Sequence, residues 1–269
     1  MITFPNAKIN LGLNVVSKRP DGYHNIETVF YPVRLYDALE IVPAAGGITT
    51  FSQTGIPIAG DPQQNLVLKA YRLLKEHYDI PELDIYLQKN IPFGAGLGGG
   101  SADAAFMLQL LNDFSGLHLQ DQQLEDYAAQ LGADCPFFIQ NRPVFAEGTG
   151  TILTPVSISL RGYYLVIIKP DIHVSTQEAY SYVKPRTPRE SVRDRICRPV
   201  ETWKDYLIND FEDGVFARFP AIGAIKQKLY EKGAVYACMS GSGSSVFGLF
   251  ETPESLQAEF PGSTVLSCS

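Results

Sequence analysis

The sequence predicts an α+β protein built from antiparallel sheets, and three features of the 269-residue chain lead to this prediction. The first fifty residues are rich in β-structure, helical patterns follow, and the strands alternate apolar and polar residues. Alternation is typical of sheets with one face in water, which are mostly antiparallel. A strand-rich start followed by mixed helices and strands indicates α+β architecture.

The period of the apolar residues predicts the elements in order. Ile9, Leu11 and Leu13 alternate as in a strand, whereas Leu66 and Ala70 stand four apart, as on one face of a helix. The predicted strands cover 9–13, 26–33, 38–42, 83–87, 163–168, 234–239 and 246–250, and the predicted helices cover 65–77, 102–114, 122–131 and 214–231.

Domain organisation is less sharply marked. We find no internal repeat and no low-complexity tract, and the second half restarts with the strand at 163–168. We therefore expect a boundary within 150–162, which divides the chain into domains at 1–155 and 156–269. The Pro/Arg-rich segment 184–198 predicts an exposed loop or a helix boundary.

Composition excludes several classes of protein. A net charge of −7 argues against a nucleic-acid partner, whose binding surfaces are normally basic. No apolar run approaches the length of a membrane span, and no secretory signal is present, so we expect a cytoplasmic protein. The four cysteines form no C-x-x-C pair, which indicates free structural thiols. We expect a monomer or a weak homodimer.

Residues 92–105 read PFGAGLGGGSADAA, and five of the seven residues from 94 to 100 are glycine. Glycines let the backbone approach a polyphosphate, and a helix that starts near Ser101 adds its dipole to the inward-pointing amides. Gly94, Gly96 and Gly99 also fit the dinucleotide fingerprint G-x-G-x-x-G, but the preceding strand alternates and a second helix follows. A P-loop lysine and the protein-kinase motifs are absent. We expect a phosphate-binding loop; a packing turn is the structural alternative.

Two further segments give this loop a context. The N-terminal PNAKINLGL and the late MSGSGSSVFGLF at 239–250 flank it in sequence, and the latter alone is compatible with a simple hairpin. The three segments in this order resemble the motifs of the galactokinase–homoserine kinase–mevalonate kinase–phosphomevalonate kinase (GHMP) superfamily, across residues 5–250. The resemblance implies an ATP-dependent small-molecule kinase that uses Mg²⁺, with a ribosomal-S5-like N-terminal domain and a ferredoxin-like C-terminal domain.

More residues narrow the resemblance to one branch. The segments PDGYHNIETVF, LGADCPFF, STQEAY and NDFE are similar to those of the members that phosphorylate a cytidine-diphosphate sugar alcohol for non-mevalonate isoprenoid synthesis. The G-R-x-N-x-x-G-E-H segment of galactokinases is absent. Another alcohol kinase of the homoserine or mevalonate type is the main alternative. A nicotinamide-dependent oxidoreductase, which binding of NAD(P) would reveal, and a non-catalytic nucleotide-binding module are the others.

The resemblance also implies the catalytic pair. Asp134 matches the base that accepts the hydroxyl proton, although an acid two residues before Pro136 is also a common helix N-cap. Lys8 matches its partner and would stabilise developing negative charge; a solvated strand lysine is the alternative.

The remaining site residues are implied in the same way. Tyr23 and His24 would hold the cytosine base by stacking and edge contacts, although a turn tyrosine can also pack on a core. The resemblance assigns Asn10, Phe30, Tyr180, Gly241, Ser242 and Gly243 to the acceptor substrate. It assigns Pro92, Gly94, Ala95, Gly96, Leu97, Gly98, Gly99, Gly100 and Ser101 to ATP, with Asn65 and Lys89 near the adenosine. Ser101, otherwise a helix N-cap, is the expected protein ligand of Mg²⁺, and Asp103 is expected to be structural.

Overall fold

The computed structural model describes residues 1–58, 60–188 and 190–268. Its described residues form two compact units that interleave along the chain. Unit 1 comprises residues 1–7, 35–93 and 98–142, and unit 2 comprises residues 8–34, 94–97 and 143–269. The predicted boundary near residue 155 would divide the chain into two consecutive segments, and it remains a prediction. No described helix is long and apolar enough to cross a membrane.

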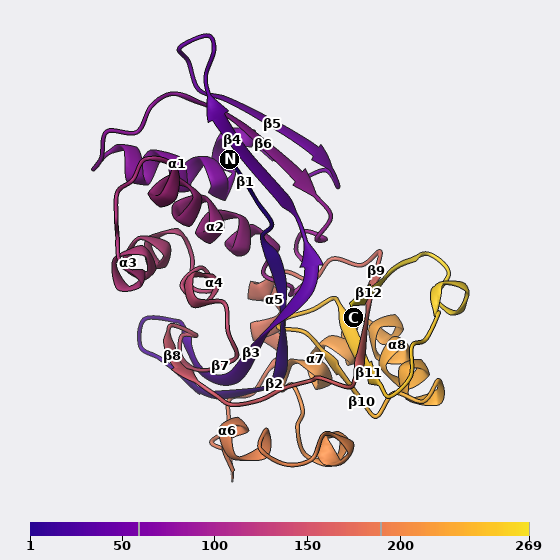
Figure 1. Cartoon of the computed structure of the whole chain (residues 1–269). Coiled ribbons are helices and arrows are strands. Elements are labelled where there is room, and N and C mark those ends of the chain that lie inside the picture. Colours follow the sequence, from indigo (N-terminus) through magenta and orange to yellow (C-terminus); the bar gives the residue numbers. More distant parts are fainter. Residues whose placement is uncertain (59, 189, 269) are drawn as a thin grey trace. The chain divides into compact units, whose positions relative to one another are not determined.

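Unit 1 contains one four-stranded sheet of order β1-β4-β6-β5 within its described residues. Helices α1 and α2 pack against each other, and Figure 1 shows them on one face of this sheet. The elements are β1 (Ile2–Thr3), β4 (Ala38–Pro43), β5 (Thr50–Gly55), η1 (Pro62–Gln64), α1 (Leu66–Lys75), β6 (Leu83–Lys89), α2 (Gly99–Phe114), α3 (Asp121–Leu131) and α4 (Phe137–Gln140).

The prediction of antiparallel sheets is wrong for one strand pair, because β5 pairs with β6 in parallel. The segment between these two strands carries α1, and a crossover through a helix is what a parallel neighbour requires. The other pairs of this sheet, β1 with β4 and β4 with β6, are antiparallel.

Helix α2 begins earlier than the predicted residue 102. It starts at Gly99, because Gly98 takes a left-handed conformation (φ 71°, ψ 12°) that ends the preceding loop. Gly98 therefore occupies the N-cap position, and no side-chain hydrogen bond caps the helix. The N-cap role considered for Ser101 is wrong, since this residue lies in the first turn.

Unit 2 contains two four-stranded sheets in the described part of the chain. The pairs β3–β7 and β7–β8 of the first sheet are antiparallel, as are the pairs β10–β11, β11–β9 and β9–β12 of the second. The first has the order β2-β3-β7-β8 and the second the order β10-β11-β9-β12. The strands are β2 (Asn6–Lys18), β3 (His24–Tyr36), β7 (Val144–Gly148), β8 (Ile152–Pro155), β9 (Tyr164–Pro170), β10 (Tyr236–Met239), β11 (Val246–Phe250) and β12 (Ser263–Cys268). The outermost residues of β2 and β3, 6–7 and 35–36, belong to unit 1.

The second sheet has the strand order of a ferredoxin-like domain. Helices lie between β9 and β10, and α8 packs on β10 and β11. The helical segments are α5 (Thr176–Tyr182), α6 (Val192–Arg195), η2 (Val200–Asp205), α7 (Phe211–Arg218), α8 (Pro220–Glu231) and η3 (Gln257–Glu259). The ferredoxin-like C-terminal fold is thus confirmed, with the short η3 turn before β12.

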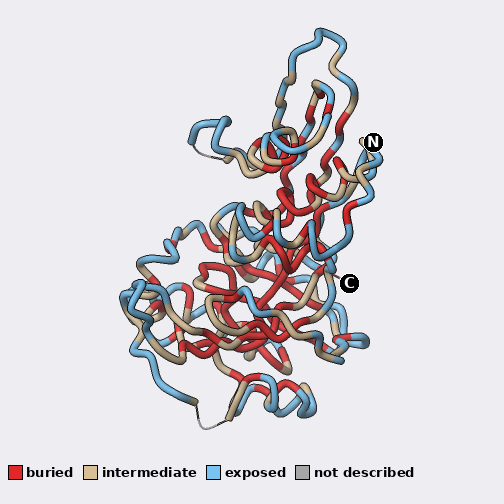
Figure 2. The backbone as a smooth tube through the Cα atoms, turned by 90° about the vertical axis from the view of Figure 1, so that its left-hand side faces the viewer, coloured by how far each residue is buried: buried red, intermediate tan, exposed pale blue. Residues whose placement is uncertain are grey.

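The predicted helix at 214–231 is two helices. Phe219 leaves the helical conformation (φ −127°, ψ 75°) because a residue before proline is pushed out of the α region, and Pro220 begins α8. The predicted loop at 184–198 contains the short helix α6, and residue 189 lies outside the described residues. Figure 2 shows the buried residues along the strands of both units, while the connecting loops are exposed.

Candidate active site

The glycine loop and the Ser/Gly turn between β10 and β11 meet within unit 2. Ser240 donates a hydrogen bond from Oγ to the carbonyl oxygen of Gly96 at 2.8 Å. A Cβ at Gly96 would lie 2.0 Å from the carbonyl oxygen of Ser240, and one at Gly241 would lie 3.5 Å from Gly96 Cα. At Gly96 only glycine permits this approach, whereas Gly241 lies at ordinary contact distance from the loop; its assignment to the acceptor substrate remains a prediction.

The rest of the loop starts helix α2 in unit 1. No side chain accepts a hydrogen bond from the first N–H groups of α2. The positive end of the dipole of this 16-residue helix lies at the same terminus. Burial raises the pKa of the Cys135 thiol to about 12, and the Ser101 hydroxyl opposes that rise. An uncapped helix start with adjacent glycines is a suitable site for a phosphate group.

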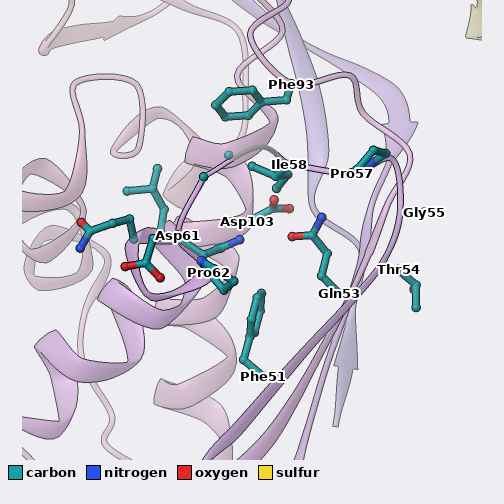
Figure 3. A pocket seen from close by; sticks show the side chains of 15 residues that line it. Phe51, Gln53, Thr54, Gly55, Pro57, Ile58, Asp61, Pro62, Phe93 and Asp103 are labelled. Atoms are coloured by element: carbon teal, nitrogen blue, oxygen red, sulfur yellow. The ribbon is translucent and has the colours of Figure 1, made fainter.

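A cavity of about 680 Å³ lies in unit 1 beside the start of α2 (Figure 3). Its wall is largely apolar, and Asn65 and Gly100 from the predicted ATP site line it. The Asn65 side chain accepts a hydrogen bond from Val67 N at 2.9 Å and so caps α1. The lining residues are Phe51, Gln53, Thr54, Gly55, Pro57, Ile58, Gly60, Asp61, Pro62, Gln64, Asn65, Leu66, Phe93, Gly100 and Asp103.

Lys8 lies in a buried polar cluster of unit 2. Its side chain is 4% exposed, and Nζ donates to Asn10 Oδ1 at 2.7 Å and lies 4.7 Å from the centre of the Phe30 ring. Asn10 in turn donates to Thr28 Oγ1 at 3.0 Å. The backbone N–H of Lys8 donates to Leu97 O at 2.9 Å, which ties the strand to the glycine loop. A solvated strand lysine is therefore excluded.

Thr28 is a member of this cluster that the sequence did not reveal. Its hydroxyl is fully buried and also donates to Gly12 O at 2.6 Å. A polar residue at an inward position of an alternating strand was the available signal, but threonine is too common in strands to be singled out.

Asp134 lies in unit 1, half-buried in the turn between α3 and α4. The N-cap position of α4 belongs to Pro136, and no side-chain hydrogen bond caps that helix. The alternative role of Asp134 as an N-cap is therefore wrong. Lys8 belongs to unit 2, so the pairing of these two residues remains a prediction.

Two residues predicted to bind the acceptor substrate, His24 and Tyr180, lie together within unit 2. The rings of His24 and Tyr180 stack with centroids 4.6 Å apart and an interplanar angle of 14°, and Tyr180 meets Phe211 edge-on. Partial burial and the charge of Lys18 lower the pKa of His24, which favours the neutral ring with one donor and one acceptor.

Tyr23 is 67% exposed, so it does not pack on the core as the structural alternative required. Phe30 was also predicted to bind the acceptor substrate, and its ring lies beside Lys8. The Ser242 hydroxyl lies 3.2 Å from that of Thr176. Gly94, in the glycine loop, lies against His173: a Cβ at Gly94 would be 3.0 Å from the His173 ring.

Lys89 is buried in a cluster of charges in unit 1. It is 2% exposed, donates to Asp103 Oδ2 at 2.7 Å and also forms an ion pair with Asp37. Burial raises the pKa of Asp103 to about 7, and the Lys89 ammonium opposes that rise. The expectation that Asp103 is structural agrees with this environment. Asp37 was missed, although an acid inside the apolar segment LYDALEIV was a usable signal.

Gly98→Val should raise KM for the nucleotide by roughly 5- to 150-fold. A β-branched residue is strained at φ 71°, and strain of about 1–3 kcal/mol would have to be relieved by moving the loop or the start of α2. Steady-state kinetics with both substrates tests this. Gly46→Val, in an exposed turn where a Cβ meets nothing within 4 Å, is the control. Equal damage to both substrates, or a lower Tm with unchanged KM, contradicts a phosphate-binding role.

Family models match both halves of the chain. The GHMP kinases N terminal domain matches residues 65–142, and the GHMP kinases C terminal model matches residues 189–260. Together they cover more than half of the sequence and confirm the two-domain GHMP-kinase fold.

Full-length relatives and solved structures agree with these models. The chain is 60% identical over 258 residues to the 4-diphosphocytidyl-2-C-methyl-D-erythritol kinase of Bacteroides fragilis, covering 95% of this chain and 94% of that one. It is 63% identical over 253 residues to the enzyme of that name from Parabacteroides distasonis, covering 94% and 93%. A crystal structure of 4-(cytidine 5'-diphospho)-2C-methyl-D-erythritol kinase matches with a TM-score of 0.82 and 32% identity, covering 100% and 98%. The mevalonate kinase of Methanococcus jannaschii (TM-score 0.71, 11% identity, covering 100% and 97%) shares the fold.

Proposed function

Because the chain belongs to the GHMP kinases, and within them to the 4-diphosphocytidyl-2-C-methyl-D-erythritol kinases, we propose that it phosphorylates the 2-hydroxyl of 4-diphosphocytidyl-2-C-methyl-D-erythritol with ATP. The observation that carries this proposal is identity of 60% or more over nearly the whole length of relatives that bear this name. The reaction supplies the non-mevalonate route to isoprenoid precursors.

The buried Lys8 cluster supports a role in charge stabilisation. Phosphoryl transfer depends on positioning and on neutralising charge, and a largely desolvated ammonium acts more strongly than one in water. Lys8 Nζ is held by Asn10, and its backbone is joined to the glycine loop, so the ammonium is fixed relative to that loop. In the proposed mechanism Asp134 accepts the proton of the reacting hydroxyl, and Lys8 stabilises the negative charge that develops.

The nucleotide site is proposed from the glycine loop and the neighbouring cavity of unit 1. The loop amides and the start of α2 would receive the phosphates, and the apolar wall of the cavity suits a planar base. Asn65 would contact that base from the rim.

Magnesium is proposed to enter with the nucleotide. No group of three His, Cys, Asp or Glu among the described residues could hold a metal, and Mg²⁺ commonly needs only one or two protein oxygens beside the phosphates. The Ser101 hydroxyl, in the first turn of α2, fits that requirement. The ion would neutralise charge on the transferred phosphate.

A substrate panel tests the proposed function. Coupled ATP turnover is measured with 4-diphosphocytidyl-2-C-methyl-D-erythritol, mevalonate, homoserine and galactose. We expect turnover with the cytidyl compound alone, and product analysis by phosphorus NMR should locate the new phosphate on the 2-hydroxyl. Faster turnover of mevalonate or homoserine than of the cytidyl compound would show that the proposed substrate is wrong and that the chain acts as another type of GHMP kinase.

Tyr23→Ala should raise KM for the cytidyl substrate by roughly 5- to 150-fold, the equivalent of about 1–3 kcal/mol of base stacking. The cytidine lies remote from the reacting hydroxyl, so kcat and KM for ATP should change little. Because Tyr23 is 67% exposed, Tm should not fall. Tyr86→Ala, a half-exposed tyrosine of β6, is the control. Normal KM values in Tyr23→Ala, or no competition by CMP or CDP in the wild type, would contradict the proposed cytidyl-binding role of Tyr23.

A further inference from the structure

A buried cluster of three charged residues connects three elements of unit 1. Lys89 is the last residue of β6, Asp37 directly precedes β4, and Asp103 lies in the second turn of α2. The Lys89 ammonium binds both carboxylates, and the side chains are 2%, 0% and 2% exposed, respectively. One lysine thus joins a strand end to the helix that follows the glycine loop.

Both ends of the glycine loop lie against this cluster. Before the loop, the backbone N–H groups of Asn90 and Ile91 donate to Asp37 Oδ1 at 2.6 and 2.9 Å. After the loop, a Cβ at Gly99 would lie 2.8 Å from Ile91 Cγ2 and 3.4 Å from Lys89 Nζ. The residues that enter the loop are thus hydrogen-bonded to Asp37, and Gly99, which leaves it, packs against Ile91 and Lys89.

The charge of the cluster argues against direct attraction of phosphate. Two carboxylates face one ammonium, and Asp103 Oδ1 has no hydrogen-bond partner among the residues that the structure describes. Buried ion pairs also add little net stability compared with apolar packing of similar volume. What the cluster does provide is geometry, because the ammonium must stay within hydrogen-bonding distance of both carboxylates.

We infer that Asp37, Lys89 and Asp103 are positioning residues that hold the ends of the glycine loop at the separation the nucleotide phosphates require. Lys89 then acts through the loop and is not itself a ligand of adenosine, contrary to the role implied by the family resemblance. The inference rests on the proposed ATP site, which it deepens.

Two substitutions of Asp103 separate a positioning role from a structural one. Asp103→Leu has a similar shape, leaves Lys89 paired with Asp37 and cuts the link to α2. Asp103→Asn keeps an oxygen that can accept from Lys89, so the link survives without the second negative charge. Neither change leaves an unpaired buried charge, so Tm should be at or above the wild-type value.

We expect Asp103→Leu to raise KM for ATP about tenfold or more, the equivalent of losing one hydrogen bond to a charged group. KM for the cytidyl substrate should change less than about threefold, and Asp103→Asn should stay within about threefold of wild type for both. Asp113→Leu, an exposed acid of the same helix, is the matched control. Assays run at about pH 8, above the raised pKa of Asp103.

Three outcomes overturn the inference. One is a wild-type KM for ATP in Asp103→Leu, which would make the cluster purely structural. Another is an equal increase in the Leu and Asn variants, which would point to charge or direct contact with the nucleotide. If the Leu variant does not fold, Asp103→Ala also cuts the link, and a wild-type KM for ATP there rejects the inference. Absence of ATP turnover in the wild type would instead reject the proposed function.

Discussion

Asp134→Asn is expected to lower kcat by at least about 10²-fold while KM for ATP changes little, the loss typical of a general base. The amide has nearly the shape of the carboxylate but cannot accept the hydroxyl proton. The fold does not depend on this side chain as a helix cap, because Pro136 holds the N-cap position of α4 without a side-chain hydrogen bond. Steady-state kinetics with the cytidyl substrate and ATP measures the effect.

Asp126→Asn, an exposed acid of α3, is the control for the loss of one negative charge in the same region. Its kcat and Tm should equal those of the wild type. Turnover of the Asp134 variant within about tenfold of wild type, with an unchanged Tm, would show that another group takes the proton.

Lys8→Ala is expected to suppress turnover to a similar degree, by about 10²-fold or more, because the proposed mechanism relies on this buried ammonium to stabilise the developing negative charge. The variant also leaves Asn10 Oδ1 without this donor, which should cost about 1–3 kcal/mol of unfolding free energy. Kinetics and thermal unfolding are therefore measured together.

Two further variants separate charge from packing at this position. Lys8→Met fills the space and should recover stability but not turnover, and Lys8→Arg should recover little activity, because a planar guanidinium does not replace a point charge in a tight site. Lys204→Ala, an exposed lysine of η2, is the control. Full kcat in Lys8→Met would reject the proposed role.

Elements with a strong apolar period could be predicted from the sequence, and those with polar patterns could not. Helix α1 buries Val67, Ala70 and Leu74 on one face, which the spacing already indicates. Strand β5, with the sequence TFSQTG, has no fully buried residue, so its apolar signal is weak. Its parallel pairing with β6 depends on a crossover that no local pattern specifies.

The residues of the candidate site likewise include some that local sequence signals indicate and some that they do not. The motifs located Lys8 and the glycine loop, because glycine density and an N-terminal lysine segment are local signals. The contact between His24 and Tyr180 joins residues 156 positions apart, and only their resemblance to a family grouped them. Asp37 offers only a weak local signal, an acid within an apolar segment, and the ion pair that gives it a role depends on Lys89, 52 residues further along the chain.

The interleaving of the two units has a consequence for synthesis of the chain on the ribosome. When residue 142 has emerged, every segment of unit 1 is present, whereas unit 2 has only residues 8–34 and 94–97. Strand β3 then lacks its neighbour β7, which begins at Val144, and an unpaired strand edge recruits strands of other chains. Because domains fold as units during translation, we expect nascent chains to be most prone to aggregation in the interval after residue 142. Slow codons placed there should lower the yield of folded enzyme more than the same codons placed after β9.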